Sequence, residues 1–392
     1  MKNDGYSDEQ ITMAGFDPGT DAHEPDTSDG VPDQAETAAP VPTEPANAEI
    51  TEPARPKPAE PTMEQWNKLY EVAGLINKIA PWEHLWDSDL ITIMLPGREE
   101  PVYCSVMGML GECYAIGVFP GYQALGSLNR MRERDEDEPY FISGLEQMCL
   151  MCHFGDREEV TPKDREVYKA LGLKFRGRNQ WVYFRAMEPG FHPWFIDMEQ
   201  ADLLIQVLQN LVMAYKHLMS GELKVDFEGG ESFLRFYSPE KELWLNTAAK
   251  VPSAPVDEAH LVIEDELLIA RLKSQKKNNQ ILEYDLVYLP MPIQEHKEDR
   301  PYLPRLLMLA DKKSGLPFGQ NVMDAREGVE NAVIDMLVKH IGKYGRPSAI
   351  YIRDERMERY VEDICHKLEI KLLQGKGMPV MNGLLEDMLG FM

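Results

Sequence analysis

Two cysteines and a histidine in one apolar segment form a motif with known chemistry. Cys149, Cys152 and His153 spell the Cys-x-x-Cys-His pattern of covalent haem attachment. Thiolates also bind zinc, and Cys104 and Cys113 would complete a set of four ligands. Haem attachment requires export, however, and only one of the two cysteine pairs has the short spacing typical of a zinc site. The apolar segment 145–154 instead favours cysteines that pack as small hydrophobic side chains, so we predict no metal site here.

A second candidate site is a basic cluster between residues 174 and 185. Its members are Lys174, Arg176, Arg178 and Arg185. They alternate with Phe175, Trp181 and Phe184, and such a mixture can neutralise and stack on a nucleic acid. The alternative is that the bases lie on the solvent-exposed face of a strand pair and form ion pairs with nearby carboxylates. We favour this alternative and keep nucleic-acid binding as a hypothesis.

Composition limits the classes of partner. The formal net charge is −25, which argues against general electrostatic binding to nucleic acid or to an anionic membrane. The sequence has no apolar run of about 18 residues or more, so no transmembrane helix is expected. The first residues lack the apolar core of a signal peptide, and the chain has five cysteines, an odd number. We therefore expect a cytoplasmic protein with reduced thiols and no membrane partner, and the sequence leaves its binding partner unknown.

The sequence divides into a tail and two folded parts. Residues 1–61 are acidic and rich in Pro, Ala, Glu and Thr, with few large apolar side chains, so we predict a disordered tail. Residues 62–222 are predicted to form an N-terminal domain, and residues 223–280 a connecting segment that contains a hairpin and then a strand or helix. Residues 281–392 are predicted to form a C-terminal α/β domain.

The N-terminal domain is predicted to be a mixed α+β structure. Apolar residues at helical spacing predict a helix over 62–79 with Thr62 as its N-cap. Short apolar runs separated by Gly and Pro predict antiparallel strands over 89–95, 101–109 and 113–119. A long amphipathic helix is predicted over 195–221, opening with Asp197 as cap and Gln200 three residues later.

The last third of the chain shows a regular order of elements. Strand-like and helix-like patterns predict a strand over 281–290, a hairpin over 305–319 and a short strand over 320–325. A helix is predicted over 327–345, followed by a strand over 347–355 and a helix over 356–369. The final strand and helix are predicted over 370–375 and 381–391. The whole chain is thus predicted to be α+β.

Several of these motifs resemble a bacterial family. PWEHLWDSDL, YCSVMGMLGE and the long run from GDREEV to LLIQVLQ are similar to a bacterial domain of unknown function. DLVYLP, LLMLADKKSGLPFG and GRPSAIYIRDERM resemble its usual partner domain, which is also uncharacterised. The resemblance covers nearly the whole chain after the tail, and it implies no activity. The family does not require cysteine at 149 and 152, which further weakens the metal interpretations.

The C-terminal order also resembles the ribonuclease H-like fold, and the segment 343–372 is similar to the helix–strand–helix of retroviral-type integrase cores. This resemblance implies an acid in the first strand, which is Asp285, and one at the end of the fourth, which is Asp354. The last helix would contribute Glu386 or Asp387. Three converging carboxylates would hold two Mg²⁺ or Mn²⁺ ions for phosphoryl chemistry. Arg356 stands where integrases carry a turn residue, however, and Asp354 also suits a helix N-cap.

Besides nucleic-acid binding by the basic cluster, these observations leave two functional hypotheses. The first is a non-catalytic binding or interaction module without a cofactor. The second is a metal-dependent nuclease, or a degenerate relative of one, that uses Asp285, Asp354 and Glu386 or Asp387. The two hypotheses differ in whether the carboxylates converge.

Overall fold

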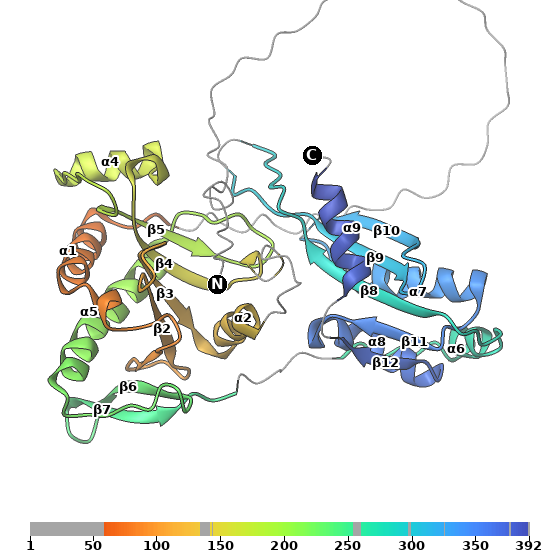
Figure 1. Cartoon of the computed structure of the whole chain (residues 1–392). Coiled ribbons are helices and arrows are strands. Elements are labelled where there is room, and N and C mark those ends of the chain that lie inside the picture. Colours follow the sequence, from red (N-terminus) through yellow and green to blue (C-terminus); the bar gives the residue numbers. More distant parts are fainter. Residues whose placement is uncertain are drawn as a thin grey trace, which may run out of the picture. The chain divides into compact units, whose positions relative to one another are not determined.

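The computed structural model describes residues 59–390 except 134–141, 143, 254–259, 297–298, 325 and 376–377 (Figure 1). The predicted tail therefore lies outside the described residues apart from its last three positions. The described part of the chain contains two mixed sheets, each with its own helices. The predicted α+β class is confirmed. No helix in the described ranges is long and apolar enough to cross a membrane.

The first sheet has seven strands in the order β5-β4-β3-β2-β1-β6-β7. The strands are β1 (Ile91–Met94), β2 (Val102–Met107), β3 (Ala115–Pro120), β4 (Cys149–Gly155), β5 (Trp181–Met187), β6 (Glu231–Ser238) and β7 (Leu243–Lys250). The strands from β1 to β5 pair antiparallel with their neighbours, whereas β6 pairs parallel with β1. The predicted antiparallel strands are thus present.

Helices cover both faces of this sheet. They are α1 (Met63–Ile79), α2 (Gly121–Glu133), α4 (Pro162–Leu171) and α5 (Met198–Ser220), with short 3₁₀ helices at Pro81–Glu83 and Arg157–Glu159. Residues of α1, α4 and α5 share one apolar core with the sheet, and α2 packs on the opposite face. Capping boxes begin α1 at Thr62 and α5 at Asp197, where Gln200 supplies the reciprocal contact, as predicted.

The segment 223–280 does not only connect the two domains but contributes elements to both. Its hairpin, β6 and β7, extends the first sheet through the parallel pairing of β6 with β1. Its helix, α6 (Glu266–Lys273), instead buries Leu272 in the core of the second sheet. Sequence could not separate these two roles, because pairing with β1 joins segments about 140 positions apart and leaves no local signal.

The second sheet has five strands in the order β10-β9-β8-β11-β12. They are β8 (Ile281–Tyr288), β9 (Arg305–Asp311), β10 (Pro317–Met323), β11 (Ala349–Ile352) and β12 (Lys371–Gln374). The strands β8, β9 and β10 are antiparallel, and β11 and β12 continue the sheet in parallel from β8. The helices are α7 (Glu330–Tyr344), α8 (Glu355–Lys367) and α9 (Pro379–Gly390).

The chain order and strand order of this domain together define its fold. Three antiparallel strands are followed by helix, strand, helix, strand and helix, with β8 in the centre of the sheet (Figure 1). This is the ribonuclease H-like order that the sequence resemblance predicted. Residues of α7 and α8 pack on one face of the sheet, and residues of α9 pack on the other.

Candidate functional site

Strand β8 presents two acidic side chains to the face that α9 covers. Leu282 and Tyr284 belong to the core beneath α7 and α8, whereas Val287 belongs to the core beneath α9. Because side chains alternate along a strand, Glu283 and Asp285 share the α9 face with Val287. Both acids are almost completely buried, at 0% and 3% exposure, since β9 and β11 flank the strand. Buried carboxylates require charged or hydrogen-bonding partners.

Asp285 finds its partner in Arg353, the residue directly after β11. Arg353 donates from Nε and Nη2 to Asp285 Oδ2 over 2.9 Å and 2.6 Å. The same Nη2 donates to Asn382 Oδ1 on α9 over 2.9 Å. The side chains of Asp285 and Arg353 are 3% and 8% exposed, so the ion pair lies in the interior. We call this network the Asp285–Arg353–Asn382 bridge; it ties the last helix to two strands.

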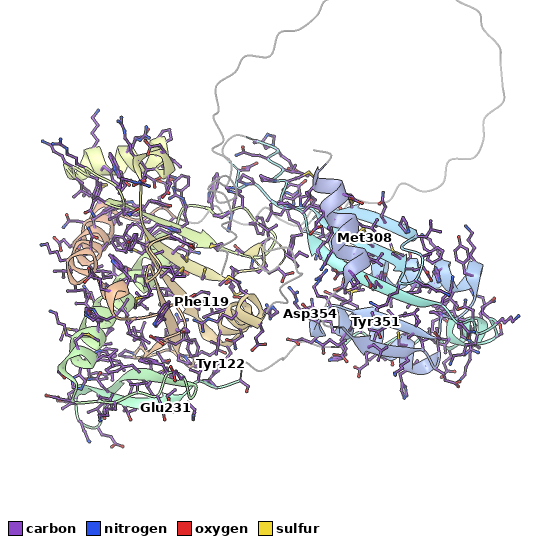
Figure 2. All side chains as sticks on the ribbon, viewed as in Figure 1. Phe119, Tyr122, Glu231, Met308, Tyr351 and Asp354 are labelled. Atoms are coloured by element: carbon purple, nitrogen blue, oxygen red, sulfur yellow. The ribbon has the colours of Figure 1, made fainter. Side chains whose placement is uncertain are left out.

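Glu283 forms a second contact between the sheet and α9. Its Oε1 accepts a hydrogen bond from Lys312 Nζ at 2.7 Å, and its Oε2 accepts the backbone N–H of Met381 at 3.0 Å. Met381 lies in the first turn of α9, where backbone N–H groups lack partners within the helix. Lys312 Nζ also lies 4.4 Å from the centroid of the Tyr351 ring, labelled in Figure 2. Glu283 therefore caps α9 from the sheet.

Asp354 begins α8 as its N-cap (Figure 2). Its carboxylate accepts hydrogen bonds from the backbone N–H and from Nε of Arg356, each at 3.0 Å. Burial raises the pKa of this carboxyl, but the Arg356 guanidinium and its hydrogen bonds outweigh burial and hold the pKa below its usual value. The helix-cap interpretation of Asp354 is confirmed.

The two acids of the last helix are exposed rather than buried in this bridge. Glu386 and Asp387 are exposed, whereas Met381, Asn382 and Leu385 form the buried side of α9. The side chain of α9 that reaches the sheet acids is thus the amide of Asn382. Glu386 and Asp387 are thus open to solvent, and Asp285 and Asp354 each pair with a different arginine.

These residues as arranged do not fit a two-metal centre. Divalent Mg²⁺ or Mn²⁺ binds oxygen ligands, mainly carboxylates, and two ions would need several. The carboxylate of Asp285 is engaged by one guanidinium, and that of Asp354 by another. Across the described ranges, no three His, Cys, Asp or Glu side chains lie together in a way that could hold a metal ion. The catalytic roles of the four acids stay predictions.

The basic cluster divides into two parts. Lys174, Arg176 and Arg178 are exposed in the loop between α4 and β5, where Arg178 pairs with Asp156 at 3.4 Å. Arg185 is instead buried, and its Nη1 and Nη2 donate to Asp164 of α4 over 3.0 Å and 2.6 Å. Three bases can thus meet a partner from solvent, whereas Arg185 holds α4 against β5.

The aromatic residues of the same segment are engaged in the core. Phe175 lies edge-on to Tyr168, with ring centroids 4.8 Å apart, and Trp181 packs near both. Phe184 is buried against Tyr70, at a centroid distance of 5.3 Å. Rings packed in this way cannot stack on nucleotide bases unless the core rearranges.

The cysteines of the Cys-x-x-Cys-His motif point to opposite faces of β4. Cys149 belongs to the core beneath α2, and Cys152 to the core beneath α1 and α5. A spacing of three along a strand necessarily separates the side chains in this way. Both thiols are buried, and burial raises the pKa of Cys149 to about 12. His153 stacks on Tyr183, with centroids 4.6 Å apart. The core-cysteine interpretation is confirmed for Cys104, Cys149 and Cys152.

Sequence reasoning missed Arg353, Asn382 and Glu283. One signal was available, because Glu283 and Asp285 are two positions apart on a strand and must share a face. Arg353 adjoins Asp354 in the sequence, but strand alternation and the start of α8 send the two side chains to different partners. Only the sheet order brings Arg353 beside Asp285, through the parallel pairing of β11 with β8.

Comparison with known proteins gives matches to solved structures and to family models. Among solved structures, the chain is similar to the HTLV-2 integrase catalytic core domain in complex with magnesium. For the dimeric form the identity is 19%, the match covers 29% of this chain and 66% of that chain, and the TM-score is 0.19. For the trimeric form the identity is 17%, the match covers 30% of this chain and 68% of that chain, and the TM-score is 0.20. It also matches a chain of the simian T-cell lymphotropic virus intasome in complex with PP2A regulatory subunit B56 gamma (21% identity, 31% of this chain, 43% of that chain, TM-score 0.20). Such low scores say nothing about activity, and the fold assignment rests on the strand order.

The chain spans just under two thirds of the first of these integrase cores. No curated protein matches it significantly. Family models match where the sequence motifs predicted, and both models carry the description "domain of unknown function". Two domains of unknown function, DUF7309 over residues 66–235 and DUF6930 over residues 268–389, thus make up most of the chain.

Proposed function

We propose that the chain is a non-catalytic binding protein whose C-terminal domain keeps a ribonuclease H-like scaffold without a working two-metal centre. The observation that supports this proposal is the buried ion pair of Asp285 with Arg353. The resemblance assigns acids to the first strand, the end of the fourth strand and the last helix. The side chains that meet in this region are Asp285, Arg353 and Asn382.

The net charge of the Asp285–Arg353–Asn382 bridge does not favour the binding of a cation. One carboxylate, one guanidinium and one amide sum to zero, so the trio offers no net attraction to a divalent cation. A metal ion would have to displace Arg353 from Asp285, and breaking a buried ion pair by removing one partner typically costs about 3–5 kcal/mol. The bridge serves instead to fix α9 on the sheet. A fixed scaffold with exposed edges suits recognition, although its partner stays unknown and its cytoplasmic location stays a prediction.

The nuclease alternative requires a different arrangement of the same residues. Arg353 would have to leave Asp285, and Glu386 or Asp387 would have to approach it. The strand order and the buried acid at the centre of β8 are the observations in its favour. This alternative predicts binding of Mg²⁺ or Mn²⁺ and cleavage of DNA or RNA, neither of which the binding proposal expects.

Isothermal titration calorimetry with Mg²⁺ and with Mn²⁺ tests the proposal on the full chain. We compare the unaltered chain, Asp285→Asn and a control, Asp202→Asn, that changes an exposed acid of α5. The expected result is no saturable heat in any of the three proteins. Saturable heat that Asp285→Asn abolishes and Asp202→Asn retains, with cleavage of a labelled oligonucleotide, would overturn the proposal. Circular dichroism checks that each variant is folded.

A further inference from the structure

An open groove follows the edge strand β10 on the side of α7. Its volume is about 710 Å³, within the range of roughly 300–1,000 Å³ that is typical of binding pockets. Strand β10 lines it from Phe318 to Met323, and α7 lines it from Asn331 to Tyr344. The groove is therefore bordered by an edge strand on one side and by a helix on the other.

The strand on one side of this groove has a free edge. In the part of the chain that the structure describes, β10 pairs with β9 on one side, and no strand pairs with its other side. Alternate backbone N–H and C=O groups of an edge strand point outward and can pair with another extended chain. Gln320 and Asn321 are exposed, as is Val322 at 57%, so solvent reaches this edge. An extended segment has hydrogen-bonding groups to meet here.

The groove contains a buried imidazole without a partner. His340 lines it from α7 and is 4% exposed, and neither ring nitrogen has a hydrogen-bond partner among the described residues. Its ring forms a cluster with those of Phe318 and Tyr344, with centroids 4.8 Å and 5.0 Å away. A neutral imidazole offers one donor and one acceptor, the same pair of groups that a peptide unit offers. Leaving such a group unpaired is costly, so a ligand that meets it gains affinity.

Gly319 faces α7 without a side chain of its own. The strand register shifts between Pro317 and Gly319, and Phe318 turns toward α7 at this irregularity. An added Cβ at Gly319 would lie 3.4 Å from Met336 Sδ, so the methionine side chain of α7 lies directly against this glycine. A glycine inside a strand often marks the close approach of another backbone. Phe318 and Met336 contribute apolar surface to the groove beside Gly319.

The two ends of the groove carry side chains of opposite charge. Lys339 and Lys343 are exposed on the last turns of α7, near Phe318. Glu327 and Asp335 are exposed toward the first turns of the helix. A ligand with an acidic residue at the lysine end and a basic residue at the other end would be complementary in charge.

We propose that this groove binds an extended peptide segment of a partner protein, which adds to β10 as a further strand. The peptide places an apolar side chain between Phe318 and Met336, and an acidic residue lies beside Lys339 and Lys343. This mode of recognition obtains affinity from main-chain hydrogen bonds and specificity from side-chain pockets. The inference rests on the proposed binding function and names its site and class of partner.

A phage-displayed library of short random linear peptides, selected on the immobilised full chain, supplies the probe. Selected peptides are synthesised, and their affinities are measured for the unaltered chain, Gly319→Val and the control Gly342→Ala. Gly342 lies on α7 outside the groove lining, and an added Cβ there meets no atom within 4 Å. We expect Gly319→Val to weaken binding about tenfold or more, a loss of about 1.4 kcal/mol, and Gly342→Ala to leave it unchanged. Amide hydrogen exchange in β10 should slow when peptide binds.

Three results would overturn the inference. They are a selection without binders, binders that Gly319→Val does not affect, and a dimer of the chain that Gly319→Val dissociates. The last result would assign the β10 edge to a second copy of the chain. None of these results changes the expected outcome of the magnesium titration, so failure of the peptide site is distinguishable from failure of the non-catalytic function.

Discussion

Arg353 donates two hydrogen bonds to one oxygen of Asp285, at 2.9 Å and 2.6 Å, and the pair lies beneath α9 in the interior of the C-terminal domain. A metal-dependent relative would need the carboxylate to face cations at this position. Here a cation of the protein itself satisfies the carboxylate, and the third member, Asn382, extends the contact to the last helix.

The Asp285–Arg353 pair is expected to behave as a coupled unit in folding. Asp285→Leu or Arg353→Met alone leaves a buried charge without its partner and should lower the free energy of unfolding by about 3–5 kcal/mol. The double variant removes both charges and should recover most of that loss. Urea unfolding of the four proteins measures the coupling. Losses that simply add would show that the two side chains do not depend on each other.

The helix cap at Asp354 gives a prediction that separates structure from catalysis. Asp354→Ala removes the acceptor for the Arg356 N–H, at a cost of about 1 kcal/mol, and also the ion pair with the Arg356 guanidinium. Asn caps nearly as well as Asp but does not restore the ion pair, so Asp354→Asn should recover the cap contribution, as measured by thermal unfolding. A metal-binding role predicts instead that both variants lose activity alike, because the Asn amide does not replace a carboxylate ligand. Loss of a measurable nuclease activity in Asp354→Asn would contradict the cap-only role.

Substitutions in the basic cluster are expected to have different effects at its exposed and its buried members. If the exposed bases bind nucleic acid, Arg176→Ala should weaken binding to a labelled single strand and reduce the salt dependence by about one phosphate contact. Lys224→Ala, an exposed base outside the cluster, serves as the control. Fluorescence anisotropy at several salt concentrations makes the measurement. Absent or salt-insensitive binding would remove the nucleic-acid hypothesis.

Arg185 should respond as a structural residue instead. Arg185→Ala leaves Asp164 buried without its bidentate partner, so we expect a loss of about 3–5 kcal/mol in unfolding free energy. The matched change at an exposed member, Arg178→Ala, should cost less than about 1 kcal/mol, since exposed ion pairs contribute little. Chemical denaturation compares the two. Equal losses would mean that Arg185 is not held in the interior.

His340 gives the protein a sensitivity to acid. Burial lowers the pKa of His340 from 6.5 to about 4, and Asp311 offsets this only in part. The unfolded chain takes up this proton below about pH 6.5 and the folded chain only below about pH 4, so the stability linked to neutral His340 is present above pH 6.5 and is lost as pH falls toward 4.

A substitution isolates this contribution. Between pH 7 and pH 5 the loss from His340 should be about 1–2 kcal/mol after allowing for solvent screening. His340→Phe removes it, and the other acid-sensitive groups, His153 among them, are common to both proteins. The difference in unfolding free energy between the two pH values should therefore be smaller in His340→Phe. An identical pH dependence in both proteins would show that His340 takes up its proton equally in the folded and unfolded states.

The sequence determined the local elements of this protein. Capping residues such as Thr62 and Asp197 act within one helical turn, so their pattern is visible without tertiary structure. The order of strands and helices after Ile281 likewise predicted the ribonuclease H-like arrangement, because each element carries its own periodicity of apolar residues. The opposite orientation of Cys149 and Cys152 also follows from their spacing on a strand.

Only the tertiary structure decided which charges meet. Asp285 and Arg353 are far apart in the chain, and the parallel pairing of β8 with β11 brings them together. Arg353 and Asp354 are neighbours in sequence, yet one enters the interior and the other caps a helix. A resemblance could assign acids to three positions, but ion pairing depends on distances of a few ångströms and on burial. Those two quantities arise from packing between distant segments, which is why the sequence predicted carboxylates where the structure has an Asp–Arg–Asn bridge.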